Sequence, residues 1–194
     1  PAHGGLGTPG IDGHGERGSS LRFSVTDIGV EDHEATLLLS DVETGLTATL
    51  ELRLGASGLF HQRITVRNVS EDDFTLTSLQ AAFPVPWDAT ELVETTGRHL
   101  RERSAQRHGF TFGTHLRESR RGRPGADATL LLTAGRPGFG FERGRVHGIH
   151  VAWSGNHRVM AERVTTGEAF LAGGELLLPG EGVLAPGESM STPW

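Results

Sequence analysis

Apolar and polar residues alternate along most of this chain, with the two-residue period that is typical of β-strands. The clearest case is residues 47–54, where every even-numbered position is apolar and every odd-numbered position is polar. Residues 21–30 and 60–67 show a similar alternation. Further strands are expected in the segments 35–42, 74–83, 109–116, 126–135, 138–153 and 176–178.

The stretch from Val146 to Val164 is predicted to form a β-hairpin around a short turn. Residues 146–153 alternate as a first strand, residues 154–156 read Ser-Gly-Asn, and residues 157–164 run back as a second strand. Small and polar residues of this kind favour tight turns. We expect Trp153 to lie on the apolar face and its ring to be mostly buried.

Helical periodicity is nearly absent from the sequence. Residues 95–107 could form one helix, but their only apolar side chains are Leu100 and Ala105, so an irregular Arg-rich connection is favoured. The 28 Gly and 9 Pro residues are spread along the chain as turn residues. Together these features predict an all-β fold: a large antiparallel β-sandwich of two sheets over residues 21–194, preceded by a Gly-rich arm over residues 1–20.

Composition narrows the classes of function. The chain has no Cys, and all 18 basic residues are Arg, so neither thiolate nor lysine chemistry is available. The formal net charge of −6 argues against nucleic acid or an anionic membrane as partner. There is no secretory signal pattern, and we expect a cytoplasmic protein; the first residue, Pro1, suggests a trimmed start.

No motif in the sequence marks a catalytic centre. The patterns of nucleophile elbows, phosphate-binding loops and zinc proteases are missing, and the ten His residues show no ligand spacing, so we predict no metal and no cofactor. Two Arg clusters, in residues 98–103 and 117–123, have guanidinium groups suited to carboxylates, sugar hydroxyls or a domain interface. The alternative is a solvated face with local Glu–Arg pairs.

Five segments, in order, resemble the N-terminal domain of the glycoside hydrolase family 36 α-galactosidases. They are the strand end at Arg67–Ser70, the G-R-W-x-x-E-R-like segment at Glu91–Arg103, the S-x-R-G-R-like loop at Arg117–Arg123, the strand and W-S-G-N turn at Gly144–Asn156, and the closing L-x-P-G-E-x-x-x-T-P-like segment at 177–193. The sequence differs from the family where His99 replaces the usual Trp, and where the N-terminal Y-P-x-x-G segment is reduced to residues 1–10.

The resemblance implies a galactose-mutarotase-like β-supersandwich that is not itself the enzyme. The parent protein would be a bacterial, homo-oligomeric α-galactosidase of carbohydrate metabolism, which hydrolyses terminal α-galactosides with retention in a separate (β/α)₈ barrel. This domain would pack on that barrel and support the active-site rim and oligomer contacts. The residues placed at the interface or rim are Arg98, Arg101, Glu102, Arg103, Arg121, Arg123, Trp153, Ser154 and Asn156. The alternatives are an independent carbohydrate-binding module and a structural interaction domain.

Overall fold

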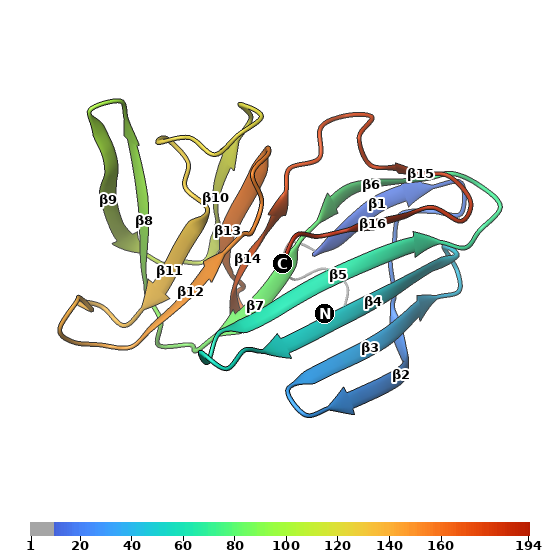
Figure 1. Cartoon of the computed structure of the whole chain (residues 1–194), viewed down its shortest axis with the longest axis horizontal. Coiled ribbons are helices and arrows are strands. Elements are labelled where there is room, and N and C mark those ends of the chain that lie inside the picture. The colour runs from blue at the N-terminus through green and yellow to red at the C-terminus, as the bar shows by residue number, and fades with distance from the viewer. Residues whose placement is uncertain (1–9) are drawn as a thin grey trace. The chain divides into compact units, whose positions relative to one another are not determined.

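A computed structural model describes residues 10–194 and contains strands but no helix in that range (Figure 1). The all-β antiparallel fold predicted from the sequence is confirmed. The strands form four sheets, and the chain divides into two compact units of two sheets each. Within the described residues there is no helix long and apolar enough to cross a membrane.

The first unit is built from residues 10–81 and 177–194. A five-stranded sheet has the order β16-β5-β4-β3-β2, and a three-stranded sheet has the order β1-β6-β15. Side chains from both sheets share one core, in which Leu46, Val66 and Leu76 are almost fully buried. The strands are β1 (Ile11–Gly15), β2 (Ser24–Glu31), β3 (Glu34–Asp41), β4 (Leu46–Leu54), β5 (Phe60–Asn68), β6 (Phe74–Leu79), β15 (Val183–Leu184) and β16 (Ser189–Ser191).

The second unit is built from residues 82–176. One sheet has the order β10-β13-β14-β7, and the other has the order β12-β11-β8-β9. Its core is separate from that of the first unit and is centred on Leu92, Leu132, Val159 and Leu171. The strands are β7 (Ala81–Val85), β8 (Glu91–Arg98), β9 (Arg101–Gly109), β10 (Gly113–Ser119), β11 (Leu131–Gly135), β12 (Val146–His150), β13 (His157–Arg163) and β14 (Ala169–Glu175).

The predicted hairpin over residues 146–164 is wrong. Both strands exist, but β12 pairs with β11, whereas β13 pairs with β10 and β14 in the other sheet of the unit. Residues 151–156 therefore cross from one sheet to the other. Val151 is buried in the shared core and Trp153 packs against that core as a partly buried ring. The backbone N–H of Val151 donates to the carbonyl oxygen of Leu130 at 3.1 Å, and apolar contacts of Val151 and Trp153 with the core also hold this segment.

The irregular connection favoured for residues 95–107 is also wrong, because this segment belongs to the regular hairpin of β8 and β9. Gly97, Leu100 and Arg103 all have positive φ, which bends the chain back on itself around residues 98–101. Strand β9 lies at the edge of its sheet, and its side chains are mostly exposed and polar. An edge strand of this kind lacks the apolar alternation that sequence analysis detects.

Part of the predicted N-terminal arm joins a sheet. Strand β1 pairs with β6, and Gly13 is buried in this pair. Its backbone lies so close to β6 that a Cβ atom on Gly13 would come within 2.4 Å of the carbonyl oxygen of Thr75. Residues 1–9 of the arm lie outside the described residues. The arm thus contributes one short strand through a glycine that permits close backbone approach.

Candidate functional site

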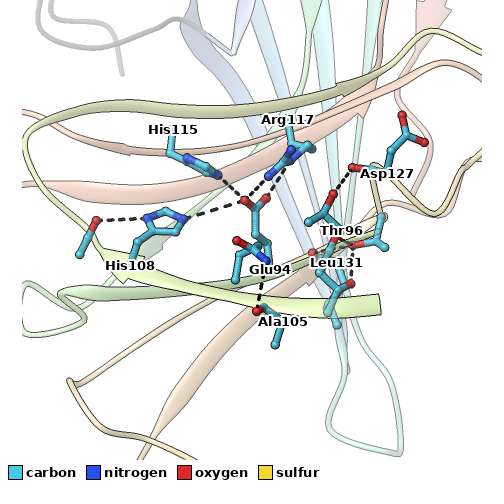
Figure 2. Close-up of polar contacts among 12 residues, drawn as sticks. Glu94, Thr96, Ala105, His108, His115, Arg117, Asp127 and Leu131 are labelled. Carbon is cyan, nitrogen blue, oxygen red and sulfur yellow. Dashed lines mark hydrogen bonds and ion pairs between the residues drawn. The ribbon is translucent and has the colours of Figure 1, made fainter. Parts of the chain in front are cut away.

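A charged cluster in the second unit gathers around the buried side chain of Glu94. Glu94 comes from β8, His108 from β9, and His115 and Arg117 from β10 (Figure 2). Alternation along β8 points Leu92 and Glu94 to the same buried side, and Leu92 is the register partner of His108. Strand β10 belongs to the other sheet of the unit, so the packing of the two sheets brings these side chains to one point.

Glu94 and Arg117 form a two-pronged ion pair inside this cluster. The Arg117 Nε atom donates to Oε2 of Glu94 at 3.1 Å, and Nη2 donates to Oε1. The Glu94 side chain is only 4 % exposed. Burial alone would raise the pKa of Glu94, but the hydrogen bonds and charge of Arg117, together with the nearby ring of His115, outweigh it and lower that pKa. Glu94 is therefore held as a carboxylate, which suits a ligand or an ion-pair partner rather than a general acid.

Two histidine rings complete the cluster on the side opposite to Arg117. The Nε2 atom of His115 lies 3.2 Å from Oε1 of Glu94, and Nε2 of His108 lies 4.0 Å from the same oxygen. The two rings are 4.5 Å apart between centroids. Both Nε2 atoms are buried and neither makes a hydrogen bond of acceptable geometry, so the 3.2 Å contact is a close approach of charge and ring rather than an aligned bond. Among the described residues, Glu94, His108 and His115 have the spacing of a possible metal site.

A second group of polar residues joins two of the segments that carry the family resemblance. The Asn156 Oδ1 atom accepts a hydrogen bond from the backbone N–H of Gly122 at 2.7 Å. The hydroxyl of the buried Ser119 donates to the carbonyl oxygen of Arg123 at 3.1 Å. The guanidinium of Arg121 pairs with Asp127 at 3.3 Å. The Gly122–Asn156 hydrogen bond thus joins the Arg loop, residues 117–123, to the turn at residues 153–156. The other two contacts hold the Arg loop itself.

Four of the remaining predicted residues, Arg98, Arg101, Glu102 and Arg103, lie at the β8–β9 hairpin. Arg98 and Arg101 line a shallow, open depression together with Thr96, Ser104 and Gln106. Exposed Glu102 accepts a hydrogen bond from the backbone N–H of Leu100 at 2.8 Å, which braces the turn. Arg103 is exposed with a positive φ, and Ser154 is exposed on the crossing segment. The nine predicted residues therefore separate into this hairpin group and the group around Asn156, and their assignment to an interface or rim stays a prediction.

Sequence reasoning missed the convergence on Glu94. His108 and His115 sit seven residues apart on either side of a short turn, and each one alone resembles a surface histidine. A useful signal was available in the alternation of His115, Arg117 and Ser119, which places all three on one face of β10. Their meeting with Glu94 depends on how two sheets pack, which a single sequence does not encode in any local pattern.

The strands and their pairing define an all-β domain of antiparallel sheets. The family profile described as the glycosyl hydrolase family 36 N-terminal domain matches residues 2–185. The chain belongs to this family, which confirms the resemblance found in its sequence.

Relatives and solved structures agree with this assignment. The chain is 34 % identical over 189 residues to an α-galactosidase of Escherichia coli, covering 96 % of this chain and 27 % of that protein. A raffinose complex of a variant of the α-galactosidase AgaA from Geobacillus stearothermophilus shares the fold with a TM-score of 0.85 at 22 % identity, covering 100 % of this chain and 30 % of that one. An α-galactosidase from Lactobacillus brevis also gives 0.85, at 18 % identity, over 96 % of this chain and 28 % of that one. The chain thus spans less than a third of the length of these relatives.

Proposed function

We propose that this chain serves as the non-catalytic N-terminal domain of an α-galactosidase and supports a separate catalytic (β/α)₈ barrel. The observation that carries the proposal is the family match over residues 2–185, in relatives more than three times as long. The parent protein would hydrolyse terminal α-galactosides, and this domain would position the rim of the active site and contribute to oligomer contacts.

The ion pairing of two carboxylates in the second unit favours a non-catalytic role for this domain. A retaining glycosidase needs one carboxyl group that can give up a proton and a second that attacks the sugar. Glu94 is bound to Arg117, and Glu118 is bound to Arg120 and Arg158, and in both cases the pKa of the carboxyl group is lowered. These are the features of structural ion pairs rather than of a proton donor.

Surface composition supports a docking role for the second unit. Trp87, Phe112 and Phe141 expose most of their side chains to solvent. A catalytic barrel or a second subunit that packs on this unit would cover such side chains. The Arg loop would add guanidinium groups that suit carboxylates or sugar hydroxyls.

Two measurements with an aryl α-galactoside test the proposal. The chain alone is expected to give no turnover, and turnover that disappears on a Glu→Gln substitution in this chain would contradict it. The second measurement uses the E. coli relative with its matching segment removed, and then with this chain in its place. We expect removal to abolish stability and activity and replacement to restore them in part, whereas a fully active enzyme without the segment would overturn the supporting role.

A further inference from the structure

We propose that Glu94, His108 and His115 form a binding site for a divalent transition-metal ion, with Zn²⁺ as the best-suited ion. The three ligand atoms, one carboxylate oxygen and two imidazole nitrogens, all lie within 4.8 Å of one another. A tetrahedral Zn²⁺ with ligands at about 2.1 Å holds neighbouring ligand atoms about 3.4 Å apart. The distances from Oε1 of Glu94 to the two Nε2 atoms, 3.2 Å and 4.0 Å, bracket this value.

The hydrogen bond on the far side of His108 prepares its ring for a cation. The Nδ1 atom of His108 lies 3.3 Å from the carbonyl oxygen of Gly109. A carbonyl oxygen can only accept, so Nδ1 is the donor, and in the tautomer that binds a metal Nε2 then presents the lone pair. Metal-bound histidines usually show this arrangement, in which the second nitrogen donates to a carbonyl group and fixes the orientation of the ring.

Both Nε2 atoms are otherwise unexplained. Each is buried and lacks a hydrogen-bond partner, which is costly for a polar atom. The two histidine side chains are 35 % and 29 % exposed, so solvent reaches the rings although their Nε2 atoms are covered. An ion between them would satisfy both nitrogens and keep a fourth position for water, as in sites with two His and one carboxylate.

Arg117 limits the affinity of the site without blocking it. Its guanidinium contacts both oxygens of Glu94, so a metal on Oε1 would compete with Nη2 while Nε keeps its bond to Oε2. When one oxygen of a carboxylate binds a metal, the other oxygen commonly accepts a hydrogen bond from the protein. The nearby positive charge opposes the cation, and binding is therefore expected to be weaker than it would be without this guanidinium.

An ion at this position would join the two sheets of the second unit. Strands β9 and β10 each form the edge of a different sheet, and Glu94 lies on the strand next to β9. A metal bridging these strands would close the open side of the sandwich. Binding to the folded state alone raises its thermal stability in proportion to the logarithm of ion concentration.

Zn²⁺ itself is the probe, titrated calorimetrically into chelator-treated protein. The test variant is His108→Gln with His115→Gln, and the matched control is His147→Gln with His150→Gln, a histidine pair on β12. We expect one equivalent to bind the parent and the control equally, and affinity to fall more than about tenfold in the test variant. Binding of Co²⁺ should produce the visible absorption of tetrahedral coordination in the parent and in the control only.

Several results would overturn the proposal. One is that the parent binds no saturable equivalent of Zn²⁺, and another is that the test variant binds Zn²⁺ as tightly as the parent. A third is that the test and control variants lose the same amount of Zn²⁺ affinity. Circular dichroism checks folding, and His108→Gln alone replaces the double variant if that one unfolds, since His108 is the more exposed ring. As an independent arm, Arg117→Gln removes the competing cation and should tighten Zn²⁺ binding; weaker binding by a folded variant would contradict the site.

Discussion

In each unit, one buried polar residue binds several backbone groups of the loops around it. The guanidinium of Arg163 donates to the carbonyl oxygens of Phe110, Trp87 and Ala89 at 3.1, 3.0 and 2.8 Å. In the first unit, the amide of the fully buried Asn68 donates to two carbonyl groups and accepts two bonds from Ser70. Such residues fix the course of loops that lack regular pairing. The Asn of the family-like strand end at Arg67–Ser70 therefore has a structural explanation.

The cross-strand pair of Glu118 and Arg158 gives a prediction for pH dependence. Burial alone would raise the pKa of Glu118, but hydrogen bonds and charges from Arg120 and Arg158 outweigh it and leave that pKa below its ordinary value. A carboxyl group whose pKa is lower in the folded state stabilises the fold above its unfolded pKa and loses this effect as pH falls through the folded value. Glu118→Gln should therefore lower the free energy of unfolding by about 1–2 kcal/mol at pH 7.

Urea unfolding at several pH values measures this effect. The difference between Glu118→Gln and the parent should shrink as pH drops below 4.5, where the unfolded carboxyl group becomes protonated and the folded one follows at lower pH. Substitution of the exposed Glu142 by Gln is the control and should change little at any pH. A constant difference across the whole range would show that the loss comes from packing and not from charge.

At the scale of elements, sequence patterns predicted strands well where one face is buried and the other is solvated. Strands β4 and β5 lie in the alternating segments 47–54 and 60–67, because one side of their sheet faces the core. The patterns failed for β9, an exposed edge, and for the pairing of β12 and β13, which depends on sheet membership. The Glu94 cluster was missed for the same reason, since its members come from strands of two sheets.

The β8–β9 hairpin depends on Gly97 in a way that can be tested. A Cβ atom at this position would lie 2.1 Å from the backbone carbonyl oxygen of Arg101, and φ is +158°. The clash is with backbone and cannot be relieved by a side-chain rotation. Gly97→Ala should therefore lower the free energy of unfolding by more than about 1 kcal/mol, measured by urea denaturation.

Gly140 provides the matched control within the same unit. A Cβ atom there meets nothing within 4 Å, and its φ is not positive, so Gly140→Ala should be nearly neutral. Equal stability of the two variants would mean that the hairpin bends differently from the structure described above. Gly97 and Arg98 are the G-R pair of the family-like segment. A glycine is needed at its first position because any side chain there would clash with the backbone of Arg101.

At the scale of the whole molecule, the two compact units have separate cores of similar construction. Each unit places two sheets face to face, and each core contains side chains from both of its sheets. The sequence predicted a single sandwich over residues 21–194, because alternation reports which faces are buried and not which sheets share a core. Division of the chain at residues 81–82 and 176–177 falls at no composition change that marks a linker.

Separate cores predict that a cavity in one unit leaves the other unit's local stability unchanged. Leu132 in the second unit and Leu46 in the first are both fully buried, and Leu→Ala at such sites costs about 2–5 kcal/mol. In native-state hydrogen exchange, Leu132→Ala should increase exchange in β8, β11, β13 and β14 while β4 and β5 keep their protection. Leu46→Ala should give the reverse pattern and thereby serve as the matched comparison. Equal increases in both units with either substitution would show that the two cores unfold together, and the division into units would then have no energetic meaning.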